Sequence, residues 1–349
     1  MSIFPLAAPT GETVQSIGTP ELWTITIVGV IALIVFDFII TRKPHDVSMK
    51  EAIGWSIFYI ALPIIFGVWI WGQYGGEVGV NFYTGWLVEK SLSVDNLFVF
   101  IVIIGSFAVP RALQQRVLLV GVAGALVLRG IFIAVGAKMI EQFAATFLVF
   151  GAILLLTAIK VYRDARSEED AQVDVNKLAV VRFIRRFWPV TGEYHGTKIT
   201  WKELGRRALT PLGLVMATII GTDIVFAIDS IPAVYGITSD PYLVFATNAF
   251  ALLGLRALYF VLEGALSKLV YLGYGLSVIL GFIGIKLVLH WAHGVWPSVP
   301  EIGSLFSLAF IVVVLTVTTI VSLRAKPLPA GTGTEVGPSA DPDHGEPSS

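Results

Sequence analysis

The strongest constraint on this chain is a series of apolar runs, each roughly 20 residues long. An α-helix of that length crosses the hydrocarbon core of a bilayer, which is about 30 Å thick, whereas a membrane β-strand alternates in polarity over about ten residues. The runs lie at approximately 22–41, 52–71, 80–105, 113–136, 143–162, 211–235, 242–263, 268–289 and 302–323. They predict an all-α, polytopic membrane bundle of about nine transmembrane helices.

The composition excludes an ordinary soluble domain and several chemistries. Of the 349 residues, 55% are hydrophobic and only 14% are charged. The chain has no cysteine, so it cannot supply thiolate metal ligands, disulfides or redox thiols. It carries no ATP-binding motif, and a net charge of -1 gives no indication of a nucleic-acid partner. No tightly bound cofactor and no enzymatic activity are expected.

Lysine and arginine are concentrated in alternate loops, which predicts the orientation because short loops rich in these residues stay cytoplasmic. The basic loops follow the first, third, fifth, seventh and ninth runs, and the long loop 163–210 is the richest. We therefore expect the N-terminus outside and the C-terminus inside. Residues 1–21 form an extracytoplasmic segment, 22–323 the transmembrane domain and 324–349 a disordered cytoplasmic tail rich in Pro, Gly, Ser and acids.

Two of the apolar runs carry the same arrangement of acids. Glu89 and Asp95 lie in EKSLSVDNLF, and Asp223 and Asp229 lie in TDIVFAIDSI, each pair six residues apart. Carboxylates are costly in hydrocarbon and persist there mainly beside a polar cavity, a cation or a basic partner. The matched pairs predict a pathway for a cation.

The acids belong to an internal repeat. Each acidic run is followed by an arginine in the next run, Arg129 or Arg256, and then by an Ile-Lys pair ending in Lys160 or Lys286. Runs three to five thus align with runs six to eight. Because each unit has three spans, the second crosses the membrane in the opposite sense, which is the inverted repeat of many secondary transporters.

The spacing within each acidic pair leaves two interpretations open. Six residues turn an α-helix by about 600°, which places the two acids roughly 120° apart around the axis. Either each helix is unwound near its acids, to which Gly221 and Pro232 would contribute in the sixth run, or the two acids have different roles, such as ligand and proton carrier.

The candidate ligands are all oxygens. Asn96, Thr222 and Ser230 add neutral donors beside the four carboxylates. Hard cations such as Mg²⁺, Ca²⁺ and Mn²⁺ prefer such ligands. His290 and His293 lie at an outer helix end, and two histidines three residues apart there are more simply interpreted as solvent-facing side chains than as metal ligands.

A purely structural role is the main competing interpretation of these charges. The acids would then neutralise the buried bases Lys90, Arg129 and Arg256. For Asp37, at the inner end of the first run, the sequence leaves two interpretations open: a functional role or pairing with Arg42.

Two further patterns concern packing and the membrane surface. Residues 175–190, VNKLAVVRFIRRFWPV, have the pattern of a basic amphipathic helix on the anionic inner leaflet. The GxxG spacings Gly121 to Gly124 and Gly281 to Gly284 predict close helix approach.

Four segments resemble the TerC family: EKSLSVDNLFVF, GTDIVFAIDSIPA, NAFALLGLRALYF and LGFIGIK. The resemblance extends from about Asp37 to the last run. It implies a bacterial inner-membrane protein of the wider lysine-exporter-like superfamily, associated with tellurium resistance and with export of Mn²⁺. The acidic motif residues that it carries over are Glu89, Asp95, Asn96, Asp223 and Asp229.

The expected function is a secondary transporter that exports a divalent cation, Mn²⁺ first, with proton exchange or the membrane potential as driving force. Glu89, Asp95, Asp223 and Asp229 would form a midplane metal site with Asn96 and Ser230 in the pathway. Tellurite, an anion, would be repelled by these carboxylates. The alternatives are an exporter of a small organic cation or amino acid, a scaffold for metal or tellurite resistance, and an aspartyl intramembrane protease, whose GxGD signature is absent. No protein partner is indicated.

Overall fold

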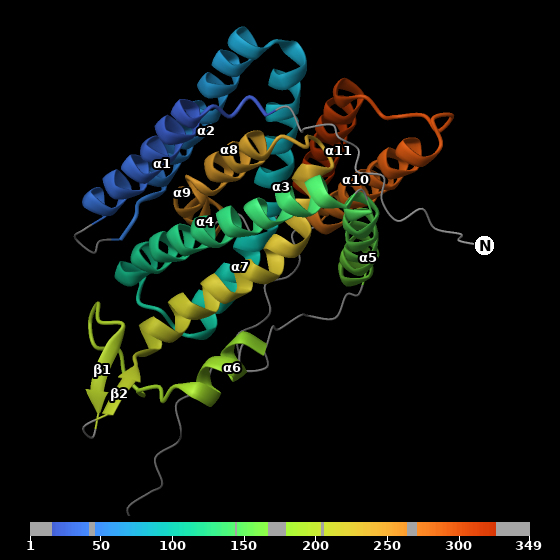
Figure 1. Cartoon of the computed structure of the whole chain (residues 1–349). Coiled ribbons are helices and arrows are strands. Elements are labelled where there is room, and N and C mark those ends of the chain that lie inside the picture. The colour runs from blue at the N-terminus through green and yellow to red at the C-terminus, as the bar shows by residue number, and fades with distance from the viewer. Residues whose placement is uncertain are drawn as a thin grey trace, which may run out of the picture.

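The computed structural model describes residues 16–41, 46–143, 145–166, 179–203, 206–263 and 271–325. This part of the chain folds into a helical bundle with one small hairpin (Figure 1). Its elements are α1 (Pro20–Ile40), α2 (Met49–Tyr74), α3 (Gly76–Ser106), α4 (Arg111–Gln142), α5 (Thr146–Arg166), α6 (Ala179–Phe187), β1 (Thr200–Glu203), β2 (Arg206–Leu209), α7 (Pro211–Tyr235), α8 (Pro241–Leu252), α9 (Leu255–Glu263), α10 (Leu272–Val295) and α11 (Ser304–Arg324).

Seven of the described helices are long and apolar enough to cross a membrane, and α8 with α9, bent by 42° at their junction, would make an eighth. The sequence predicts about nine spans, and the difference is α3. This helix has 31 residues, long enough at about 1.5 Å per residue, but it carries Glu89, Lys90 and Asp95 within its length. The chain is therefore a polytopic α-helical membrane protein with seven or eight candidate spans in the described residues.

Local sequence signals account for where several helices begin. In α1, α7 and α8 a proline occupies the first turn, where its missing N–H is not needed. The preceding residues, Thr19, Thr210 and Asp240, accept a hydrogen bond from a first-turn backbone N–H through their side chains. Proline and cap together fix these boundaries close to those expected from the apolar runs.

The central helices pack in crossed pairs. The most extensive helix contacts are between α5 and α10, α4 and α7, α3 and α8, and α2 and α3. Helices α1 and α11 lie at the periphery (Figure 1), and most of their side chains are exposed. An exposed apolar helix face in a membrane bundle is the face that meets lipid.

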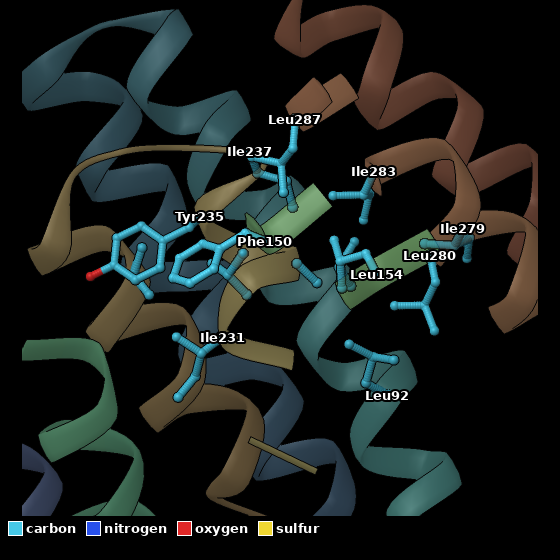
Figure 2. Close-up of a cluster of buried hydrophobic side chains, with 14 of the residues drawn as sticks. Leu92, Phe150, Leu154, Ile231, Tyr235, Ile237, Ile279, Leu280, Ile283 and Leu287 are labelled. Atoms are coloured by element: carbon cyan, nitrogen blue, oxygen red, sulfur yellow. The ribbon is translucent and has the colours of Figure 1, made fainter. Parts of the chain in front are cut away.

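The largest apolar cluster lies where α5, α7 and α10 meet (Figure 2). Phe150 and Leu154 of α5 lie among Ile283 and Leu287 of α10 and Tyr235 of α7. The cluster packs the C-terminal half of α7, which carries Asp229, against the α5–α10 pair.

Glycines let these helices approach closely, as the sequence predicts for Gly121, Gly124 and Gly284. At Gly281 an added Cβ would have only ordinary contact, 3.8 Å from the Cβ of Ala158. A Cβ on Gly284 of α10 would lie 3.1 Å from the carbonyl oxygen of Gly151 on α5. A Cβ on Gly121 of α4 would lie 2.6 Å from Ile219 of α7, and one on Gly124 would lie 2.8 Å from Ile220. Since backbone approach at these crossings leaves no space for a side chain, the small residues set the interhelical distance.

The break between α8 and α9 depends on a single glycine. Gly254 has φ +84°, a left-handed conformation that disfavours other residues. Its α-carbon also faces Tyr59 of α2 so closely that an added Cβ would overlap the tyrosine Cβ. The break therefore lies against the packed surface of α2.

The long loop contains more structure than the sequence analysis predicts. A helix, α6, falls within the expected basic amphipathic segment, of which residues 175–178 lie outside the described part. An antiparallel hairpin that the analysis missed follows it, with Thr200 paired to Leu209 and Trp201 to Ala208. The predicted tail beyond residue 325 and the first 15 residues also lie outside the described residues.

Candidate functional site

Arg129 of α4 lies between the first acids of the two pairs. Its Nε and Nη2 donate to the carboxylate of Asp223 on α7 at 3.1 and 2.9 Å. Its Nη1 forms an ion pair with Glu89 of α3 and donates to Asn248 Oδ1 of α8 at 3.0 Å. All four side chains are buried, at 0–1% exposure. One guanidinium thus joins α3, α4, α7 and α8. These four helices lie side by side in the bundle (Figure 1).

The charges in this cluster do not balance. Two carboxylates face one guanidinium, so the cluster carries a formal charge of −1 when both acids are ionised. Glu89 Oε2 is buried and has no hydrogen-bond partner in the described part of the chain. A buried surplus charge is costly unless a cation or a proton neutralises it. The cluster is therefore a place where a cation or a proton is favoured.

The second acids of the two pairs lie in a different environment. Asp95 and Asp229 are each partly exposed, and neither forms a salt bridge with a described residue. The two carboxylates lie within electrostatic range of each other, and Asp229 is also within range of Arg129. Two like charges held near each other inside a membrane bundle are stabilised by a shared cation or a proton.

Neutral oxygens also lie on the acidic helices, but on the side of the first acids. At about 100° per residue, Ser93 and Asn96 of α3 share the face of Glu89, and Ser230 of α7 shares the face of Asp223. The hydroxyl groups of Ser93 and Ser230 are buried and have no hydrogen-bond partner among the described residues. Asn96 is also buried, at 5% exposure. The hydroxyl of Thr222, in contrast, donates to the carbonyl of Thr218 in its own helix at 2.7 Å. Ser93 and Ser230 are thus hydroxyls available to a ligand on the side of the first acids.

The acidic helices are not unwound. Helices α3 and α7 are continuous through all four acids, so the interpretation that they are unwound near these residues is wrong. Pro232 lies in the last turn of α7, and Gly221 instead accommodates Val180 of α6, which a Cβ would approach to 2.6 Å. With helical geometry retained, the roughly 120° between the acids of a pair places them in two environments. This geometry favours different roles for the two acids.

The four carboxylates do not gather into one cluster. Among the described residues, no three His, Asp or Glu side chains are grouped closely enough to hold a metal ion. Glu89 and Asp223 instead pair with Arg129, while Asp95 and Asp229 form no salt bridge with a described residue.

Arg256 has a different partner from Arg129, although the repeat aligns them. It donates to Asp37 of α1 through Nε at 3.0 Å and Nη2 at 2.5 Å. Its Nη1 donates to Gln115 of α4 at 3.0 Å. Arg256 therefore does not neutralise the four acids, and Asp37 pairs with it, whereas Arg42 lies outside the described residues.

Lys90 contacts a backbone group rather than a carboxylate. Its Nζ donates at 3.2 Å to the carbonyl of Ala251, in the last turn of α8 just before the break. A cation at a helix C-terminus is favoured by the helix dipole and by the unpaired carbonyls there. Lys90 thus links the acidic helix α3 to the broken span α8–α9.

The two histidines near the C-terminal end of α10 are engaged in contacts of their own. His290 Nδ1 lies 2.8 Å from Glu301 Oε1, and His293 Nδ1 donates to the carbonyl of Val299 at 2.6 Å. Both contacts connect α10 to the segment before α11.

The sequence analysis missed three polar residues of the centre: Asn248, Ser93 and Gln115. Asn248 opens the motif NAFALLGLRALYF, and Ser93 lies two residues before Asp95, so both had a local signal. Gln115 had none, because its role follows from where α4 meets Arg256.

The fold and the centre define a class of protein. The chain is a polytopic α-helical membrane protein with a buried, incompletely neutralised charge cluster joining four of its helices. The family model described as "Integral membrane protein TerC family" matches residues 74–328. The chain belongs to the TerC family of integral membrane proteins.

Curated relatives agree with this membership. The chain is 45% identical over 273 residues to an uncharacterized membrane protein of Mycobacterium tuberculosis (strain ATCC 25618 / H37Rv), covering 78% of this chain and 69% of the relative. It is 39% identical over 285 residues to the protein of Escherichia coli (strain K12) named "Putative membrane-bound redox modulator Alx", covering 79% of this chain and 88% of the relative. No solved structure matches the chain.

Proposed function

We propose that this protein is a secondary transporter that exports a divalent cation, with Mn²⁺ as its first candidate substrate. The observation that carries the proposal is the Asp95–Asp229 pair, two carboxylates from separate helices that lie within electrostatic range without a salt-bridge partner in the described residues. A cation passing between α3 and α7 would be stabilised there.

The ligand chemistry supports a hard cation. Asp95 and Asp229 offer carboxylate oxygens. On the same two helices, but on the faces of Glu89 and Asp223, Ser93 and Ser230 offer hydroxyls without a partner among the described residues. Mn²⁺, Mg²⁺ and Ca²⁺ favour such donors, and a cation that keeps part of its water shell needs few protein ligands. Because a transporter must also release the ion, a site with few protein ligands is compatible with transport.

In this proposal the Arg129 cluster has a second role. Glu89 and Asp223 share one guanidinium, so a single protonation leaves the cluster neutral. Because Arg129 already contacts both carboxylates, the cluster would be neutralised more readily by a proton than by a metal ion. The first acids would carry protons and the second acids would carry the cation.

The helix contacts support an inverted repeat as the framework of transport. If α3, α4 and α5 correspond to α7, α8–α9 and α10, the α4–α7 contact corresponds to the α8–α3 contact. Both are among the most extensive in the bundle, and α5 packs on its own counterpart α10. Such a relation is typical of transporters that alternate access around a central site.

The name of the Escherichia coli relative points to a membrane redox modulator. With no cysteine, this chain cannot carry out thiol redox chemistry itself. A change in metal supply across the membrane would affect redox state indirectly, which is compatible with an exporter.

Manganese content in cells tests the proposal. A bacterial host without its own manganese exporters would express the parent, Asp95→Asn or Asp229→Asn, and total cellular manganese would be measured after a manganese load. The matched control is Glu141→Gln, a carboxylate-to-amide change at an exposed position of α4. Expression of each variant in the membrane is checked by immunoblot.

The expected result is low cellular manganese with the parent and Glu141→Gln, and high manganese with either aspartate variant. Equal manganese content in cells with parent and with empty vector would contradict manganese export. Export that persists in both aspartate variants would contradict the proposed route and favour a scaffold.

A further inference from the structure

Helix α6 presents an arginine side and an aromatic side that are both exposed. Successive residues of an α-helix turn by about 100°, which places Arg182, Arg185 and Arg186 together and Phe183 and Phe187 on the neighbouring side. Phe183 and Phe187 are 61% and 59% exposed, and their ring centroids lie 4.7 Å apart. All three arginines are exposed, and no salt bridge to a described residue occupies them.

The third side of α6 fixes it to the membrane bundle. Val181 is buried in the same apolar cluster as Val215 of α7, at 0% exposure, and Ile184 is buried at 7%. Val180 rests on Gly221, where no side chain would fit. Because α6 is held along α7 (Figure 1), its exposed sides keep a fixed orientation next to the apolar surface of the bundle.

Further exposed aromatic and basic side chains follow α6 in the chain. Trp188, directly after the helix, is 54% exposed, and Lys198, Lys202 and Arg207 of the hairpin region are exposed as well. Aromatic rings beside arginines and lysines are typical of the boundary between acyl chains and headgroups, where rings enter the apolar layer and cations meet phosphates.

We propose that α6 is a docking surface for anionic phospholipid, with the phenylalanines among the acyl chains and the three arginines on the headgroups. Charge complementarity selects the lipid, since three guanidiniums within about two turns attract an anionic headgroup and gain little from a zwitterionic one. The surface lies in the loop that the charge distribution places on the cytoplasmic side, where the leaflet is anionic. This role does not depend on which ion the protein transports.

A fluorescence-quenching experiment tests the proposal on the full chain. Because the chain has no cysteine, Phe183→Cys introduces a single site for an environment-sensitive dye. The labelled protein is placed in nanodiscs with a fixed mixture of phosphatidylcholine and phosphatidylglycerol, and bromine quenchers are carried by one lipid or the other. The control label is Val313→Cys on α11, a position that is 59% exposed and distant from α6 in the fold (Figure 1).

The dye at position 183 should be quenched more by brominated phosphatidylglycerol than by brominated phosphatidylcholine, whereas the dye at position 313 should show no preference. Each arginine replaced by glutamine should lower the preference by up to about fivefold, and the triple change Arg182→Gln/Arg185→Gln/Arg186→Gln should abolish it. If the triple variant does not elute as folded protein, Arg185→Gln alone carries the test.

Equal quenching by the two lipids at position 183, or a preference that survives the triple change, would overturn the proposal. Loss of the preference on addition of soluble inorganic phosphate would also overturn it, because the site would then bind free anions rather than the leaflet. None of these readouts measures transport, so a failure here is separate from a failure of the export proposal.

Discussion

Arg129 is the residue whose replacement should damage this protein most. Arg129→Gln removes the guanidinium that donates to Asp223 at 3.1 and 2.9 Å and pairs with Glu89, and it leaves two carboxylates of 0–1% exposure without a basic partner. Breaking one buried ion pair by removing one partner costs about 3–5 kcal/mol. With two acids left unpaired, we expect the free energy of unfolding to fall by at least that amount.

Substitutions at the two partners of Arg129, Glu89 and Asp223, should change the free energy of unfolding in different ways. Glu89→Gln keeps the Arg129–Asp223 contact and removes the surplus charge, so its cost should be about 1 kcal/mol or less. Combining Arg129→Gln with Asp223→Asn removes both members of the bidentate contact and should recover about 1–3 kcal/mol relative to the sum of the single changes.

Reversible unfolding in mixed micelles with increasing dodecyl sulfate, followed by helical circular dichroism, measures these free energies. Glu141→Gln is the matched control at an exposed carboxylate. An Arg129→Gln variant within about 1 kcal/mol of the parent, or strictly additive effects of Arg129→Gln and Asp223→Asn, would refute the assignment of Arg129 as the charge partner of both acids.

Three further outcomes follow from the packing; the same unfolding assay checks the first two and hydrogen exchange checks the third. Gly254→Ala should destabilise the protein by at least about 1–2 kcal/mol, because φ is +84° and the methyl group would overlap Tyr59. The control Gly294→Ala, at a position of α10 with open space around it, should be neutral or slightly stabilising. Asp37→Asn should cost about 3 kcal/mol by stranding buried Arg256, and a further Arg256→Gln change should restore part of this; a cost near zero would contradict the ion pair. Lys90→Met should speed hydrogen exchange at the end of α8, measured by mass spectrometry, since the Ala251 carbonyl loses its donor; unchanged exchange there would contradict the link.

Much of the architecture could be predicted from the sequence because membrane helices are constrained by length. The predicted run 211–235 coincides with α7, where Thr210 and Pro211 mark the start. The broken span was not predicted, because Gly254 lies within an apolar run and glycines in membrane helices commonly serve close packing. Only its positive φ and its contact with Tyr59 distinguish it.

The candidate site shows where local sequence stops being informative. Arg129 and Arg256 lie in similar segments, LRGIF and LRALYF, yet one pairs with Glu89 and Asp223 and the other with Asp37. The difference arises because α1, outside the repeat, brings Asp37 to Arg256. Such a choice depends on which helices are adjacent, and a single sequence does not specify it.

The division of the acids into two environments follows from helical geometry, but its assignment needed the tertiary structure. The six-residue spacing already implies two faces of each helix. Which face meets Arg129 depends on the crossing of α3, α4 and α7, so the first acids could not be told from the second by sequence alone.

Radioactive manganese uptake into inside-out proteoliposomes is the most direct test of the central claim that this chain moves a divalent cation past Asp95 and Asp229. The measurement compares the parent with Asp95→Asn, Asp229→Asn and the control Glu141→Gln, under a proton gradient and under a membrane potential, with Mg²⁺ and Ca²⁺ as competitors. The account predicts uptake by the parent and the control that either aspartate change abolishes. Absence of uptake by folded parent protein under both driving forces would contradict it.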